Sequence, residues 1–209
     1  MGRKKVTQEH TNRRRAEIMQ AATDVFARKG YLASGIADIA KKLDVGHGTI
    51  YRYFSNKLDI FLCILKDTIA EMLVIADQYV QKEAHSVAEY ELQIQQQGVE
   101  FMMLFLKNPQ RMRFIFEEMH SDLKVRELIA KSFVEFQEKT VLFFQKGVKI
   151  KAIRPDLDLP TAARLTNAMV FETMRSIILG SNSDANNLKI IETIQKILLH
   201  GIGNPVKKN

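Results

Sequence analysis

The sequence predicts an all-α protein, and three observations lead to this prediction. Apolar residues recur three and four positions apart along most of the chain, the spacing that gives an α-helix one buried face. Only four Pro and ten Gly interrupt the 209 residues. No stretch keeps the alternation of apolar and polar residues that marks a strand. With 46% apolar residues, the chain can bury the core of one or two small domains.

Gly and Pro residues mark the ends of the expected helices. Gly30 is expected to end the first helix in a left-handed conformation, and Pro109 and Pro160 to stand in the first turns of later helices. Residues 1–12 are expected to be disordered. The nine expected helices run from Thr11 or Asn12 to Gly30, over 36–43 and 47–53, from a cap at Ser55 or Asn56 to about Val80, and over 87–106, 109–120, 122–151, 159–179 and 185–200.

The net charge lies entirely in the first quarter of the chain. Residues 1–57 hold twelve Lys and Arg against five Asp and Glu, whereas the remainder holds nineteen of each. This asymmetry indicates a module that binds a polyanion, joined to a module with another task. A basic tail that only improves solubility is the alternative. We therefore expect two domains, 1–57 and 58–209.

The segment 36–54 has the form of a helix-turn-helix motif, two short helices joined by a turn that contains Gly. Ile50 and Phe54 lie four residues apart and are expected to face inward, which leaves the opposite surface free to enter the major groove of DNA. Arg52 suits the O6 and N7 atoms of guanine, His47 suits a base edge, and the hydroxyl side chains and Lys57 suit phosphate. The predicted DNA-binding residues are Ser34, Gly35, His47, Gly48, Thr49, Tyr51, Arg52, Tyr53 and Lys57.

About 50 residues, from Arg13 to Phe61, resemble the N-terminal domain of TetR-family transcriptional regulators. The shared residues are Ile18, Ala21, Ala22, Phe26, Gly30, Tyr31, Asp38, Ile39, Ala40, Val45, Gly48, Thr49, Ile50, Tyr51, Phe54 and Lys57. Departures from the usual pattern are Asp44 in place of the turn Gly, Gly46 in place of a capping Ser, and His47 at a position that faces the bases. The resemblance implies a nine-helix fold, a dimer interface on the last two helices and a pocket for a small molecule in the C-terminal bundle.

The resemblance and the charge together predict a ligand-responsive transcriptional repressor that binds a palindromic operator in double-stranded DNA as a homodimer. Release by a small, largely apolar effector is expected, since most Phe and Met residues lie beyond residue 100 and residues 58–209 as a whole have no net charge. Most of these side chains must form ordinary core. The predicted ligand-binding residues are Met102, Phe105, Phe116, His120, Phe136, Thr140 and Met169, with Asn167 as a further polar group.

The last two expected helices each carry more apolar surface than one buried face requires. A surface helix needs one apolar stripe, and a second stripe indicates either a central helix or a partner chain. We expect a partner chain. The predicted dimer interface comprises Val170, Met174, Ile177, Ile191, Ile194 and Leu198.

Other classes of function find little support in the sequence. No apolar run exceeds six residues, so neither a membrane span nor a secretory signal is expected. The five His are dispersed and Cys63 is the one cysteine, which predicts no metal site, no cofactor and a cytoplasmic location. No catalytic motif is present, so the chain is expected not to be an enzyme. The alternatives are an architectural DNA-binding protein without an effector and, further off, an enzyme built on the C-terminal helices.

Overall fold

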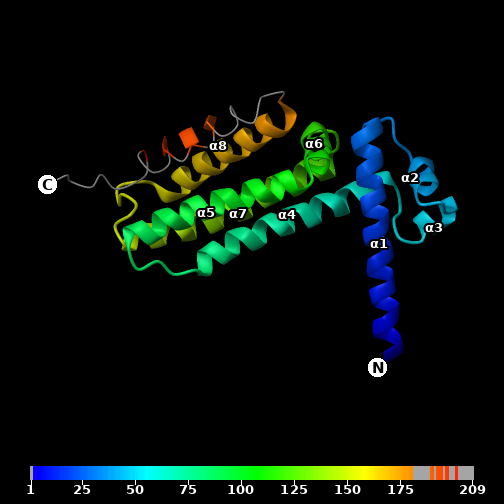
Figure 1. The fold of residues 1–209 in the computed structure, drawn as a ribbon, viewed down its shortest axis with the longest axis horizontal. Coiled ribbons are helices and arrows are strands. Elements are labelled where there is room, and N and C mark those ends of the chain that lie inside the picture. Colours follow the sequence, from blue (N-terminus) through cyan, green and yellow to red (C-terminus); the bar gives the residue numbers. More distant parts are fainter. Residues whose placement is uncertain (1, 181–188, 191, 195, 198–200, 202–209) are drawn as a thin grey trace. The chain divides into compact units, whose positions relative to one another are not determined.

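The structure is a computed structural model that describes residues 2–180, 189, 190, 192–194, 196, 197 and 201, with side chains from residue 8 onward (Figure 1). All regular elements with assigned bounds in this part of the chain are helices, which confirms the all-α prediction. They are α1 (Gly2–Lys29), α2 (Ile36–Lys42), α3 (His47–Tyr51), α4 (Lys57–Gln81), α5 (Val87–Lys107), α6 (Pro109–Glu118), α7 (Leu123–Lys149) and α8 (Leu159–Leu179). The described residues between 189 and 197 are also helical.

The turn chemistry expected from the sequence is present at several helix ends. Gly30 has φ 80°, the left-handed conformation expected after the first helix. Asp44 has φ 52° in the turn between α2 and α3, a left-handed conformation that Asp tolerates. Asn56 caps α4, because its side-chain oxygen accepts a hydrogen bond from the Asp59 amide at 2.9 Å.

The first helix begins earlier than expected. Helix α1 starts at Gly2, so the expectation of disorder over residues 1–12 was wrong for residues 2–12. The apolar stripe that marks a buried face begins only at Ile18, and the preceding turns are polar. Polar side chains support that part of the helix instead, since Gln8 donates a hydrogen bond to Asn12 at 3.0 Å and Arg13 to Glu17 at 3.2 Å.

The chain packs as two compact units that do not follow the sequence order. The first unit contains the described residues of 1–69 and 109–125, and the second those of 70–108 and 126–209. Helix α4 contributes to both units, and α6 belongs to the first. The expected division at residue 57 concerns function instead of packing, and it stays a prediction.

An aromatic cluster forms part of the core of the first unit. Phe26 of α1 contacts Tyr31 and Phe114 with ring centroids 5.1 and 5.5 Å apart. Phe61 of α4 contacts the same two rings, at 5.1 and 5.6 Å. All four side chains are buried. The cluster therefore joins α1, α4 and α6.

In the second unit, a close approach between helices α5 and α7 depends on Gly147. Tyr90 of α5 is fully buried, stacks on Phe143 with ring centroids 4.7 Å apart, and donates a hydrogen bond to the Phe143 carbonyl at 3.0 Å. A Cβ atom at Gly147 would lie 2.7 Å from the Tyr90 ring and 2.8 Å from Ile153. The missing side chain is therefore what lets the tyrosine ring lie against α7. Burial raises the pKa of the Tyr90 hydroxyl above its usual value.

Candidate DNA-binding face and ligand cavity

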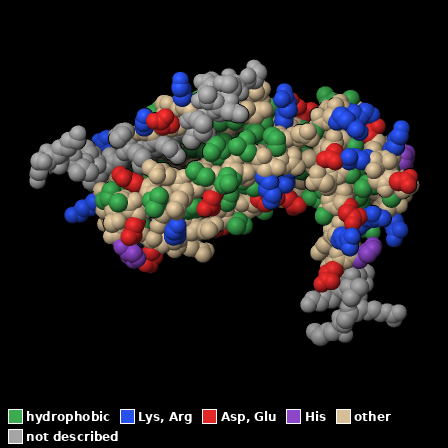
Figure 2. All heavy atoms as spheres, viewed as in Figure 1, with side chains coloured by type: hydrophobic (Ala, Val, Ile, Leu, Met, Phe, Trp, Pro, Cys, Tyr) green, Lys and Arg blue, Asp and Glu red, His purple; other side chains and the backbone are tan. Residues whose placement is uncertain are grey.

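Helix α3 has one buried and one exposed face, as expected. Ile50 is buried on its inner face, and Phe54 is buried just beyond its end. His47, Tyr51 and Arg52 are exposed, with Tyr51 at 56%. Gly48 is exposed and Thr49 is half-buried. Figure 2 shows Lys and Arg side chains spread over the visible surface of the first unit. The exposed face thus offers hydrogen-bond donors in a basic setting, which suits DNA.

The start of helix α2 is fixed by an acidic side chain and not by Gly35 itself. The Asp38 carboxylate accepts a hydrogen bond from the Gly35 amide at 2.9 Å, and Lys29 of α1 lies 2.5 Å from the same carboxylate. The Lys29 ammonium, followed by the Gly35 amide, lowers the pKa of Asp38. Gly35 was predicted to contact DNA, and this capping arrangement was not predicted, although Asp38 stands at the third helical position, where such caps occur.

Two of the residues predicted to contact DNA have polar groups that form hydrogen bonds within the chain. Ser34 is buried, and its hydroxyl donates a hydrogen bond to the Gly30 carbonyl at 2.5 Å. Tyr53 is half-buried, and its carbonyl accepts a hydrogen bond from Arg15 at 2.5 Å. Arg15 also lies over the Phe54 ring, 4.2 Å from its centroid. Sequence reasoning missed Arg15, which fixes the segment after α3 to α1.

Lys57 was predicted to contact phosphate, but in the structure its ammonium group binds backbone oxygens. It donates hydrogen bonds to the carbonyls of Tyr31 at 2.6 Å, Ser34 at 2.9 Å and Leu32 at 3.4 Å. It also lies 4.3 Å from the centroid of the Tyr31 ring. Burial lowers the pKa of the Lys57 ammonium, while Glu118 opposes that effect. Lys57 therefore fixes the loop between α1 and α2.

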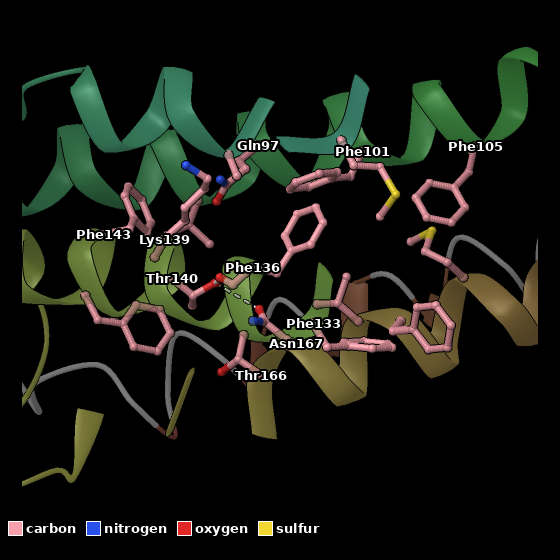
Figure 3. A pocket seen from close by; sticks show the side chains of 18 residues that line it. Gln97, Phe101, Phe105, Phe133, Phe136, Lys139, Thr140, Phe143, Thr166 and Asn167 are labelled. Atoms are coloured by element: carbon pink, nitrogen blue, oxygen red, sulfur yellow. Dashed lines mark hydrogen bonds between the residues drawn. The ribbon is translucent and has the colours of Figure 1, made fainter. Parts of the chain in front are cut away.

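The second unit contains a largely apolar cavity of about 150 Å³ (Figure 3). Helices α4, α5, α7 and α8 supply its wall. Phe101 and Phe136, from facing helices, lie with ring centroids 6.2 Å apart, and Phe133 contacts Phe171 at 4.9 Å. Such a wall of aromatic rings with few polar groups is typical of sites for apolar ligands.

A small group of polar side chains interrupts this apolar wall. Thr140 Oγ1 lies 3.0 Å from Asn167 Oδ1 and 2.9 Å from the Phe136 carbonyl oxygen, so its one proton serves either acceptor. Lys139 Nζ lies 2.5 Å from the Asp77 carboxylate. Figure 3 shows the Thr140–Asn167 hydrogen bond beside the Phe136 ring.

Three of the seven residues predicted to bind ligand, Phe105, Phe136 and Thr140, line this cavity, as does Asn167. Met102 and Met169 are each next to a lining residue, and one step along a helix turns the side chain by about 100°. Phe116 and His120 lie in the first unit, Phe116 in its core and His120 exposed. These four residues are therefore not part of the cavity wall.

Two residues of α8 that were assigned to a dimer interface face the cavity. Val170 and Met174 line the cavity, and Met174 is buried. Ile177 and Ile194 are half-buried, while Ile191 and Leu198 lie outside the described residues. The face of α8 that points away from the cavity carries Leu165, which is 62% exposed. The dimer interface itself stays a prediction.

The part of the chain that the structure describes offers neither a candidate metal site nor a candidate membrane span. No group of three or more His, Cys, Asp or Glu side chains is placed to hold a metal ion there. None of the helices in that part has the length and apolar character to cross a membrane.

Comparison with known proteins finds transcriptional regulators, both for the helix-turn-helix alone and for nearly the whole chain. The family model for bacterial regulatory proteins of the tetR family matches residues 18–64, which span the helix-turn-helix. A fatty acid metabolism regulator protein of Bacillus subtilis is 23% identical over 188 residues, 90% of this chain and 95% of that protein.

Solved structures share the fold along nearly the whole chain. The transcriptional regulator FadR of Bacillus subtilis, solved in complex with stearoyl-CoA, has a TM-score of 0.72 and 22% identity, covering 90% of this chain and 98% of that one. A gamma-butyrolactone receptor has a TM-score of 0.71 and 20% identity, covering 94% of this chain and 91% of that one.

The position of Lys57 predicts that its removal lowers stability. Lys57→Met keeps most of the aliphatic stem but removes the donor to three carbonyls, so we expect the free energy of unfolding to fall by about 1–3 kcal/mol. Urea denaturation measures the change. Lys66→Met is the matched control, because Lys66 is exposed on the same helix. Equal stability of the two variants would show that the carbonyl contacts contribute nothing.

Proposed function

Because the chain belongs to the TetR family of bacterial regulatory proteins, we propose that it is a ligand-responsive repressor that binds a palindromic operator as a homodimer. Its coarser function, a DNA-binding transcriptional regulator and not an enzyme, follows from the family and its relatives. The observation that carries the finer proposal is the pairing of an exposed basic helix-turn-helix with an apolar cavity in the same chain. An architectural protein would have no use for the cavity.

In the proposed DNA complex, some residues on and near α3 contact bases, some contact phosphates, and others only position the backbone. Arg52 and His47 are exposed at opposite ends of a short helix and are free to meet base edges. Thr49 and Tyr51 lie between them and suit the phosphates on either side. In this proposal Lys57, Ser34 and the Gly35 amide act indirectly, because they hold the loop and the start of α2 in place.

Arg52→Ala is expected to weaken specific operator binding by about 1–3 kcal/mol per half-site, because a contact to guanine is lost. Fluorescence anisotropy with operator DNA and with an unrelated duplex measures the effect, and the unrelated duplex should be affected much less. Arg113→Ala is the matched control, an exposed arginine on α6 outside the helix-turn-helix. If Arg52→Ala left the preference for the operator intact, the groove assignment would be wrong.

The cavity supports a largely apolar effector. Its wall is mostly Phe, Met and aliphatic side chains, and residues 58–209 have no net charge to attract a strongly charged metabolite. One relative is named a fatty acid metabolism regulator, and the similar FadR structure holds stearoyl-CoA. We therefore place fatty acyl compounds first among the effectors to test. Met72 and Ala76 of α4 line the cavity, and the same helix begins at Lys57, so an effector that displaces α4 would disturb the DNA-binding face.

Thr140→Phe is expected to abolish release of the operator by an apolar effector while leaving operator affinity unchanged, because the larger side chain fills the cavity. The panel for the release assay contains fatty acids, stearoyl-CoA, aromatic compounds, sugars and nucleotides. Calorimetry on the compounds that release should show a negative heat-capacity change. Val134→Phe is the matched control, since Val134 lies on the same helix with its side chain 57% exposed. Release by sugars or nucleotides alone would refute an apolar site, and release by no compound would favour the effector-free alternative.

We also propose that the last two helices form the homodimer interface, which would place two α3 helices about 34 Å apart on DNA. Leu165 on the outer face of α8 and Ile197 beyond it are large apolar side chains, 62% and 52% exposed. Exposed apolar side chains on neighbouring segments fit a self-complementary contact with a second copy.

Leu165→Glu is expected to give monomers with an unchanged helical signal, because the charge would be buried in the interface. Sedimentation velocity measures the mass, and circular dichroism the helix content. Leu92→Glu, at an exposed position on α5, is the matched control and should remain dimeric. Dimers formed equally by both variants would rule out this face of α8.

A further inference from the structure

The cavity wall contains a buried polar group that the folded chain leaves unsatisfied. Asn167 Nδ2 is inaccessible to solvent and has no hydrogen-bond partner among the described residues. The other end of the same amide is occupied, since Asn167 Oδ1 lies 3.0 Å from Thr140 Oγ1. Phe133 and Phe136 belong to the same wall (Figure 3). Phe171 also lines the cavity.

A donor in this position indicates a missing acceptor. Nearly all buried N–H groups in proteins have a partner, because leaving one unpaired costs the full loss of its hydration. The neighbouring rings supply no strong acceptor, and Thr140 Oγ1 lies at the oxygen end of the amide, away from Nδ2. A ligand oxygen that enters the cavity would supply that acceptor while its apolar part contacts the rings.

The charges of the wall indicate that this oxygen is neutral. Lys139 is the one charged residue among the side chains that line the described cavity, and its ammonium lies 2.5 Å from the Asp77 carboxylate. That pair leaves no net positive charge to compensate a buried anion. A carboxylate at Asn167 would therefore lose its hydration with one neutral donor in return, which is strongly unfavourable.

We propose that Asn167 Nδ2 donates a hydrogen bond to the carbonyl oxygen of a neutral, otherwise apolar effector, and that Thr140 positions the amide for this contact. A ketone, an ester or a thioester would present such an oxygen. The inference rests on the proposed function, because it identifies the effector class of the same cavity.

Three probes of equal chain length test the proposal on the full chain: methyl heptyl ketone, nonane and nonanoate. Each displaces the fluorescent apolar dye N-phenylnaphthylamine, which gives its Kd. The readout is the ratio of the nonane Kd to the ketone Kd in each variant, because hydrophobicity alone sets that ratio when no hydrogen bond is made. Asn167→Leu is expected to lower the ratio about fivefold relative to the original chain, through loss of one hydrogen bond.

Two further variants keep the test decisive. Thr166→Val removes a hydroxyl from the neighbouring position in the wall, and its ratio should not change. Asn167→Ala should reproduce the fall seen with Asn167→Leu, and circular dichroism verifies that each variant is folded. An unchanged ratio in both Asn167 variants would overturn the inference while leaving the apolar cavity in place.

Two other outcomes would contradict the proposals. Tighter binding of nonanoate than of the ketone by the original chain would overturn the assignment of a neutral effector. Failure of the dye and of all three probes to bind would overturn the proposed function together with this inference.

Discussion

The contact between four aromatic rings is the constraint on which the DNA-facing part of the molecule depends. Phe26, Tyr31, Phe61 and Phe114 contact one another at centroid distances between 5.1 and 5.6 Å. Two of the four rings come from beyond residue 57, one of them from the middle of the chain. The first unit therefore has no complete core within residues 1–57, because Phe61 of α4 and Phe114 of α6 supply half of this cluster.

Local rules predicted the helices well, because each helix end depends on a few neighbouring residues. Gly30 and Asp44 adopt the left-handed conformations expected of them, and α8 begins at the predicted residue with Asp158 accepting from the Thr161 amide. The rules failed where no apolar stripe was available, at the start of α1. They also could not predict that α6 packs in the first unit, because this depends on contacts between residues far apart in the sequence.

The candidate sites were predictable in type but only partly in detail. Periodicity showed that α8 has two apolar faces, yet nothing local says which face meets the cavity, and the assignment of Val170 and Met174 to a partner chain came from the resemblance. A lysine near a helix-turn-helix is equally suited to phosphate and to carbonyl oxygens, so Lys57 could be placed only by the folded loop. The unsatisfied amide of Asn167 emerges only once its neighbours are known.

The way Lys57 holds its loop has a consequence for tolerance to substitution. Its three acceptors are main-chain oxygens, which every amino acid supplies, so the ammonium group is insensitive to the identity of the side chains there. Leu32, 81% exposed, is accordingly free to change, and so is the exposed Ala33. Tyr31 lacks that freedom, because its ring contacts both the lysine and the core. Sequence diversity in this loop is therefore permitted at its tip and restricted at its base.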